Sequence, residues 1–258
     1  KLLDNGEGAQ GKWCHHRLVN GKALFFELPS HLHESAAAGI LLQVARQHRC
    51  VMSKGSGDIV IGETTKLEPD ESIYISKANE PRPGAVDARG KRLPKIVVEV
   101  SYSEPNRSIG SLPRLYFSVG GEEAIQGVIL VFIRHADPPV EGRCQLVALL
   151  YDYRADRDAE GYPVPSAAIS FGDYLHGSTK TAIAYHCRVP EELWTGALGM
   201  HPEVVCDRPE LEPFQLQIDG ELLWRGYDPA ARARLAANNE AFVVDLFELK
   251  AGIKDDFI

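Results

Sequence analysis

The sequence predicts one layered α/β (α+β) fold, with a central mixed sheet flanked by helices. Two observations carry this prediction. The predicted elements run in the order helix, strand, strand, strand, helix, strand, followed by further β structure, and such alternation is typical of layers packed around one core. The composition is that of an ordinary globular chain, with 44% hydrophobic and 25% charged residues over 258 positions. A chain of this length can bury a core without disulfide support.

The first helix is predicted over residues 32–47, where apolar residues repeat with helical spacing. It follows the helix-start signal Leu28-Pro29-Ser30, and a strand-like stretch at 23–27 precedes that signal. A second helix is predicted over 107–119, with Pro113 early in it, where proline is tolerated. The segment 78–93 is rich in proline and glycine and is predicted to be a loop.

Strands are predicted where short β-branched or alternating runs end at turn residues. In the first part of the chain these runs are 58–62, 72–76, 95–102, 126–134 and 144–153. In the last hundred residues, 166–171 and 214–223 are β-like, the second with an Asp219-Gly220 hairpin turn. Residues 229–247 are predicted to be helical.

The predicted organisation is a lead-in at 1–19, a core at 20–155 and a C-terminal extension at 156–258 that packs on the core. The formal net charge is −8, and residues 161–258 hold 8 Lys+Arg against 15 Asp+Glu. An acidic surface argues against tight, sequence-independent DNA binding, although it leaves room for a local basic groove. No apolar run approaches the length of a membrane span, so no membrane partner is expected.

Five cysteines occur, none of them in a Cys-x-x-Cys pair. An odd count without metal-type spacing predicts reduced, mostly buried thiols and an intracellular location, cytoplasmic or nuclear. The pairs His15-His16 and His31/His33 lack a third ligand at useful spacing, so they are interpreted as surface or cap residues.

Two acidic residues carry the predicted chemistry. Glu99 lies within an apolar strand, where its charge is costly without a partner or a metal ion. Asp70 stands at the start of the preceding predicted strand, after Pro69. Two carboxylates that converge at strand ends are ligands of the kind Mg²⁺ prefers. The alternatives are a turn aspartate at position 70 and a buried Glu99 paired with Lys95 or Arg114.

Pro69-Asp70 followed by Glu99-Val100-Ser101 resembles the PD-(D/E)XK nuclease superfamily. More narrowly, it is similar to restriction-endonuclease-like domains with a degenerate second half-motif, E-V-S in place of E-x-K. The resemblance includes His33-Glu34 in the first helix, Leu115-Tyr116 in the second, and the apolar strand 128–133. It covers roughly 20–155 and implies a restriction-endonuclease-like core in α-β-β-β-α-β order.

The resemblance also implies roles for individual residues. Asp70, Glu99 and the backbone carbonyl of Val100 would hold Mg²⁺ or Mn²⁺, and Glu34 could complete the shell, with helix N-terminal charge compensation as its alternative role. The motif lysine is replaced by Ser101, which can hold a water but has no charge. In related sequences the following helix can supply the cation, which here points to Arg114 and secondarily to Arg107.

A basic run next to the predicted acidic site suggests phosphate contacts. After Arg82, it contains Arg89, Lys91, Arg92 and Lys95 against Asp87 alone. Such cations could position a phosphate backbone. The alternative is a solvated loop that happens to be basic.

The leading functional prediction is a Mg²⁺-dependent nuclease-like protein that hydrolyses phosphodiester bonds of DNA or RNA. Asp70 and Glu99 would hold the metal, Ser101 a water, and Arg114 the transition-state charge. Two rivals stay open: a catalytically degenerate member that binds nucleic acid or protein, and an enzyme that uses the cleft for a small molecule. The expected partner is a nucleic acid, and a homodimer is left open.

Overall fold

The computed structural model describes residues 16–19, 21–25, 31–76, 85–102, 104–135, 143–227, 229–237 and 240–255. Arg82, Cys14 and His15 lie outside these ranges. Cys50, Cys144, Cys187 and Cys206, the four cysteines that are described, are buried and form no disulfide with one another. In the described part of the chain, no helix has the length and apolar character that a bilayer crossing requires.

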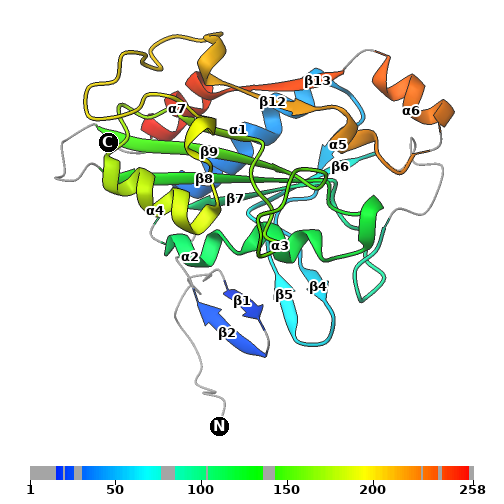
Figure 1. The fold of residues 1–258 in the computed structure, drawn as a ribbon. Helices are drawn as coiled ribbons and strands as arrows, with labels where there is room; N and C mark the ends of the chain where they lie inside the picture. Colours follow the sequence, from blue (N-terminus) through cyan, green and yellow to red (C-terminus); the bar gives the residue numbers. More distant parts are fainter. Residues whose placement is uncertain are drawn as a thin grey trace, which may run out of the picture.

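A mixed seven-stranded sheet forms the centre of the molecule, with the order β11-β10-β9-β8-β7-β6-β3 (Figure 1). The β7–β8 and β10–β11 pairs are parallel, and the other neighbours are antiparallel. The predicted class, a mixed sheet flanked by helices, is confirmed. The strands are β3 (Val51–Ser53), β6 (Glu71–Ile75), β7 (Ile96–Ser101), β8 (Gly127–His135), β9 (Cys144–Asp152), β10 (Ala167–Ser170) and β11 (Trp194–Gly196).

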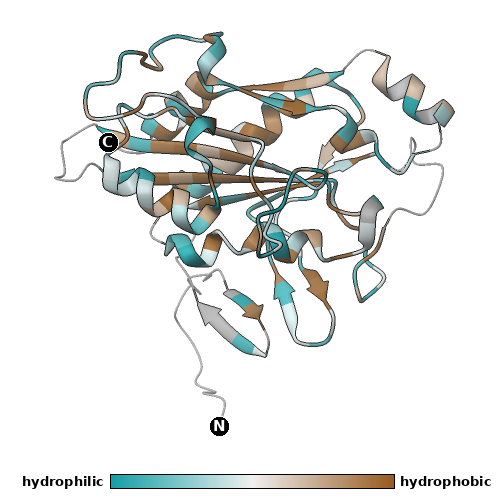
Figure 2. Cartoon of the chain, in the orientation of Figure 1, coloured by the Kyte–Doolittle hydropathy of each residue, from teal (hydrophilic) through white to brown (hydrophobic). Residues whose placement is uncertain are grey.

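Helices cover both faces of this sheet, so its central strands are apolar on both sides (Figure 2). One face packs against α1 (His31–Gln47), α5 (Glu221–Trp224) and α7 (Leu246–Asp255). The other packs against α2 (Asn106–Ile109), α3 (Leu112–Phe117) and α4 (Gly177–Cys187). In β7 the alternation sends Val98 to the α1 side and Val97 to the α3 side. Glu99 therefore faces α3.

A second, four-stranded antiparallel sheet lies beside the α2–α3 layer (Figure 1). Its order is β2 (Lys22–Phe25), β1 (His16–Val19), β5 (Thr65–Leu67), β4 (Ile59–Ile61). The predicted strand 58–62 belongs here and not to the central sheet, which corrects the sequence prediction. Ile59–Ile61 turns back at once through Gly62, whose φ is +63°, and pairs with β5. Its predicted place is taken by β3, three residues long and too short to show a pattern.

Two predictions for the C-terminal extension are wrong. Asp219-Gly220 is not a hairpin turn, because the Asp219 side chain accepts the amide of Glu221 and starts α5. The predicted helix 229–247 contains α6 (Pro229–Ala236) and then strand β13 (Ala241–Asp245) before α7 begins. β13 pairs with β12 (Gln215–Asp219) and buries Phe242 and Val244 in the α1-side core. This long-range pairing outweighs the local helical tendency of the segment.

The predicted helix 107–119 is two helices, α2 and α3, separated at Gly110-Ser111. Pro113 lies in the first turn of α3, as predicted. The break lets α2 lie against α4 while α3 carries Tyr116 under β7.

Candidate functional site

Asp70, the residue just before β6, lies across from Glu99 on β7. β6 and β7 are antiparallel with Glu71 opposite Val98, and the same register extended by one residue sets Asp70 opposite Glu99. Directly opposed residues share a face of the sheet, with Cβ atoms about 5 Å apart. Asp70 Oδ2 accepts the backbone amide of Val100 at 2.5 Å. The structure thus brings the two predicted acids together.

Two side chains hold Glu99, and the sequence alone had linked neither of them to it. Its Oε2 lies 2.8 Å from Nη2 of Arg17, on β1, and its Oε1 accepts the hydroxyl of Tyr116, on α3. Arg17 also forms an ion pair with Glu104, just after β7. Glu99 is only 1% exposed, so the cation beside it determines whether its charge is tolerable. We call Asp70, Glu99, Glu104, Arg17 and Tyr116 the acidic centre.

The electrostatics of the centre follow from burial and from the closeness of the carboxylates to one another. Desolvation raises the pKa of Asp70, and the Glu99 charge raises it further, against the Val100 amide and Arg17. Desolvation also raises the pKa of Glu99, although Arg17 and Tyr116 oppose it. For Arg17, the charges of Glu99 and Glu104 outweigh desolvation and raise the pKa, so the guanidinium stays protonated. The permanent charge of Arg17 therefore acts on all three carboxylates, Asp70, Glu99 and Glu104.

Ser101, at the motif lysine position, is buried beside a second arginine. Arg134 Nη2 donates to Ser101 Oγ at 2.7 Å and to the Glu104 carbonyl at 3.1 Å. It also donates to Asn106 Oδ1 at 3.0 Å, at the start of α2. Arg134 thereby fixes the turn that carries Glu104 toward Arg17. Its guanidinium, from the end of β8, occupies space next to the position where a motif lysine would extend.

Arg114 does not supply the cation of the acidic centre. Its side chain is exposed, and its Cζ lies 4.4 Å from the centroid of the Tyr162 ring. Arg114 and Tyr116 are two residues apart on α3, which places their side chains about 200° apart around the helix axis. Because Tyr116 faces Glu99, Arg114 faces away. Neither alternative partner of Glu99 is correct, since Arg17 holds that position and not Lys95 or Arg114.

Lys95 does not face solvent as a phosphate contact would. It is 6% exposed, and its Nζ donates to the carbonyls of Glu123 and Arg225 at 2.6 and 2.9 Å. The remaining basic residues differ in access. Arg92 is partly buried and donates to the Ile75 carbonyl, whereas Arg89 and Lys91 are exposed.

Glu34 is exposed in the first turn of α1, which covers the face of the sheet opposite Glu99. Its role as a metal ligand stays a prediction. Among the described residues, no group of three or more His, Cys, Asp or Glu side chains is placed to hold a metal ion. His33 is buried, its ring edge-on to Tyr102, and so is not a surface residue.

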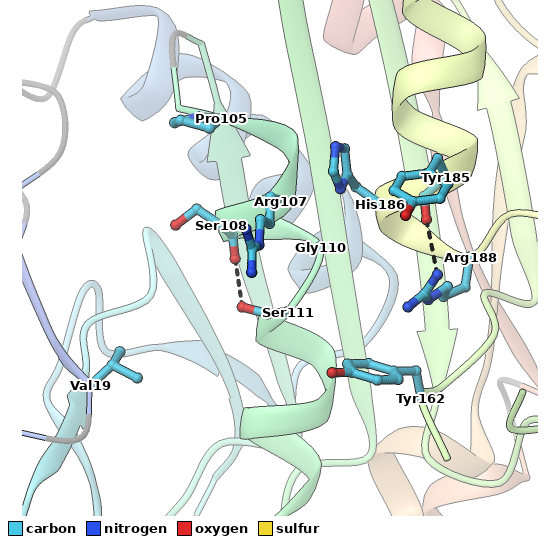
Figure 3. Close-up of a pocket in the computed structure, with 10 residues that line it drawn as sticks. All are labelled: Val19, Pro105, Arg107, Ser108, Gly110, Ser111, Tyr162, Tyr185, His186 and Arg188. Carbon is cyan, nitrogen blue, oxygen red and sulfur yellow. Dashed lines mark hydrogen bonds between the residues drawn. The ribbon is translucent and has the colours of Figure 1, made fainter. Parts of the chain in front are cut away.

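A groove of about 880 Å³ lies beside the acidic centre, between α2 and the end of α4 (Figure 3). Val19, two residues along β1 from Arg17, and Pro105, next to Glu104, form its near side. Sequence reasoning did not connect its residues, which come from β1, α2, α4 and the loop before β10. We call it the α2–α4 groove; its charged and aromatic lining residues are Arg107, Tyr162, Tyr185, His186 and Arg188.

Sequence reasoning also missed Arg17, Glu104 and Arg134. An arginine in a short strand gives no sign that it crosses to an acid 82 residues away. The sequence did give an indication of Tyr116, because Leu115-Tyr116 was part of the family resemblance.

No protein-family model matches this chain, and no curated protein resembles it significantly. Among solved structures, it is similar to a protein from Anabaena variabilis described as "a putative nuclease belonging to DUF820". The TM-score is 0.36 and the sequence identity 15%, covering 65% of this chain and 83% of the other. Similarity at this level carries no argument, so the functional interpretation depends on the residues of the site.

Proposed function

We propose that this chain is a nuclease-like protein in which Asp70 and Glu99 hold Mg²⁺ or Mn²⁺ for the hydrolysis of phosphodiester bonds in DNA or RNA. The observation that carries the proposal is the closeness of these two acids where β6 begins beside β7, with Asp70 bonded to the amide of Val100 and interacting with the Glu99 charge. Two strand-borne carboxylates with one open side are a common way to bind Mg²⁺, with water and phosphate oxygens completing its shell.

The chemistry of the donor set fits a divalent cation. Asp70, Glu99 and Glu104 bring negative charge into a poorly solvated place, where desolvation raises the pKa of both Asp70 and Glu99. A metal bound by Asp70, Glu99 and the Val100 carbonyl would stabilise the ionised form of both acids. Such an ion, when bound, polarises a phosphodiester and lowers the pKa of a bound water.

Arg17 can supply the positive charge, but not the other functions, of the lysine that the resemblance would lead us to expect. It places a permanent positive charge beside Glu99 and can stabilise negative charge that develops on a phosphate. It cannot act as a base, because a guanidinium stays protonated. Tyr116 fixes the second oxygen of Glu99 and so sets the direction of the carboxylate.

A second candidate function is binding without cleavage. Ser101 stands where the motif lysine would be, and both Glu99 oxygens already have partners in Arg17 and Tyr116. In this reading the ion pair replaces the metal and the fold serves only to recognise a nucleic acid.

Calorimetric titration of Mg²⁺ and Mn²⁺ into wild type, Glu99→Gln and the exposed control Glu203→Gln separates the two functions. The same proteins are tested for nicking of plasmid and cutting of single-stranded DNA and RNA. We expect metal binding and cleavage in wild type and in Glu203→Gln, and loss of both in Glu99→Gln. If wild type binds metal but cuts no polynucleotide, the hydrolysis part of the proposal fails. If wild type binds no metal, the nuclease proposal fails.

A further inference from the structure

We propose that the α2–α4 groove binds an unpaired nucleotide of a single-stranded nucleic acid, with the base on the Tyr185 ring and the phosphate beside Arg107. The inference deepens the proposed function, on which it rests for the class of polymer, by naming the form that the polymer takes. The contacts that carry it are separate from the acidic centre.

Two backbone features shape the groove: the tight approach of Gly110 to α4, and the end of α4 at Arg188. At Gly110 a Cβ atom would lie 2.4 Å from the His186 carbonyl oxygen, so only glycine lets the turn after α2 approach the end of α4. α4 then ends at Arg188, in the left-handed conformation with φ 59°. Asp158 and Glu160 hold the Arg188 guanidinium at 3.3 and 3.0 Å. The wall formed by α4 is therefore preorganised.

Tyr185 supplies the stacking surface. Its side chain is 68% exposed, which is a large exposure for an aromatic residue. Tyr162, deeper in the groove, already carries Arg114 and Arg188 over its ring at 4.4 and 5.0 Å. Tyr185 has Arg188 at 5.9 Å and the His186 ring edge-on at 5.0 Å. An exposed ring flanked by cations is the arrangement on which unpaired bases stack.

Arg107 supplies the phosphate contact. It lies on α2 across the groove from the aromatic wall, and its side chain is exposed (Figure 3). Within the part of the chain that the structure describes, no carboxylate is within ion-pair distance of its guanidinium, in contrast to Arg188. A guanidinium without an acidic partner is suited to a phosphate oxygen. Because the net charge of the chain is −8, the protein as a whole does not attract a nucleic acid, and binding depends on a local cation such as Arg107.

The form of the ligand follows from these two groups. Stacking on Tyr185 needs an open base face, which a duplex hides between neighbouring base pairs. A groove of about 880 Å³ is in the range of pockets that enclose a small ligand, and it accepts a nucleotide without enclosing a polymer. The strand can then continue past Pro105 and Val19 toward the acidic centre.

The test is fluorescence anisotropy with labelled single-stranded dT and U 12-mers, in EDTA so that binding is measured without cleavage. Wild type is compared with Tyr185→Ala, Tyr185→Phe, Arg107→Ala and Arg46→Ala. Arg46 is an exposed cation on α1, across the sheet, and serves as the matched control. Competitors are the same sequence as a duplex, a free nucleoside monophosphate and polyglutamate.

We expect Tyr185→Ala to weaken binding by roughly 5- to 100-fold, the range for loss of one stacked base, and Tyr185→Phe to retain it. Arg107→Ala should make the negative slope of log affinity against log salt less steep by about 0.7. Arg46→Ala should match wild type. Because Tyr185 and Arg107 are exposed, their variants are expected to fold; circular dichroism checks this.

Several outcomes overturn the inference: no single-strand binding by wild type, equal binding by Tyr185→Ala and Arg46→Ala, or duplex or polyglutamate competing as well as the single strand. Competition by the free mononucleotide alone would identify a nucleotide site and not a polymer site. If single strands bind through Tyr185 but metal-loaded protein cuts nothing, the inference stands and the nuclease proposal fails. If the wild-type protein cuts nucleic acid but Tyr185→Ala binds single strands normally, the nuclease proposal stands and the inference about the groove fails.

Discussion

Arg17 Nη2 and Glu99 Oε2 lie 2.8 Å apart, although 82 residues separate them in the chain. The pair joins the small sheet to the central one at a place where both side chains are buried. With or without a metal in the acidic centre, this contact places a permanent positive charge beside the buried Glu99.

Replacement of Arg17 by methionine should lower the free energy of unfolding by about 3–5 kcal/mol, because Glu99 and Glu104 then stay buried without their cation. Urea denaturation at pH 7 measures the loss. Arg188→Met is the control; its ion pairs are at the surface, and it should cost at most about 1 kcal/mol. Glu99→Gln should cost less in the Arg17→Met protein than in wild type. Equal costs in the two backgrounds would show that the pair does not interact energetically.

Replacement of Ser101 by lysine should destabilise the protein and should not increase any nuclease activity. Position 101 is fully buried, and the Arg134 guanidinium already lies 2.7 Å from the serine hydroxyl. A second cation there is repelled and poorly solvated. Thermal unfolding and plasmid nicking are measured beside Ser101→Ala, which adds no charge. A stable lysine variant that cuts faster than wild type would contradict this account of the site.

Lys95→Met should reduce stability by roughly 1–3 kcal/mol without changing affinity for nucleic acid. The buried amine bonds the carbonyls of Glu123 and Arg225, and methionine leaves both without that donor. Arg89→Ala, at an exposed position, should change stability by less than about 0.5 kcal/mol. Denaturation and anisotropy measured on both proteins decide the point. Weaker binding in a fully stable Lys95→Met protein would restore the phosphate role first predicted for it.

Gly110→Ala should destabilise the protein by about 1–3 kcal/mol, since its Cβ would meet the His186 carbonyl oxygen. Gly252→Ala is the matched control. Gly252 lies within α7, exposed and with open space around it, so alanine there should stabilise by about 0.4–1 kcal/mol. Denaturation of the two variants tests the contrast. The prediction is wrong if both glycines tolerate alanine equally.

Asp173 should contribute stability that is lost in acid. Burial favours a higher pKa for this carboxyl, but the Lys254 hydrogen bond, the Cys144 amide and the Lys250 charge outweigh it and lower the pKa. Because the folded pKa is below the ordinary aspartate value of 3.8, the contribution is complete above that value and disappears as the pH falls through the folded pKa. The stability difference between wild type and Asp173→Asn should therefore be constant near neutrality and shrink below about pH 4. A difference that grows on acidification would contradict the sign.

The sequence predicted the central strands from Ser72 to Asp152 because their alternation and their turn residues are local signals. It failed at β3, which is three residues long, and at β13, where an Ala-rich stretch resembles a helix but pairs with β12. At the acidic centre it predicted Asp70 and Glu99, since strand position and motif spacing can be read along the chain. Arg17 and Arg134 could not be predicted, because nothing near them in sequence specifies the partner.

By itself, then, the residue pattern determined the layered α/β class, because the periodicity of apolar residues is a local signal. It also predicted, from element order and motif spacing, that Asp70 and Glu99 come together. Only the tertiary structure decided which cation reaches Glu99, that Lys95 is buried and that Arg114 points toward Tyr162. Those outcomes depend on how separate elements pack, and on the cost of leaving a buried charge without a partner.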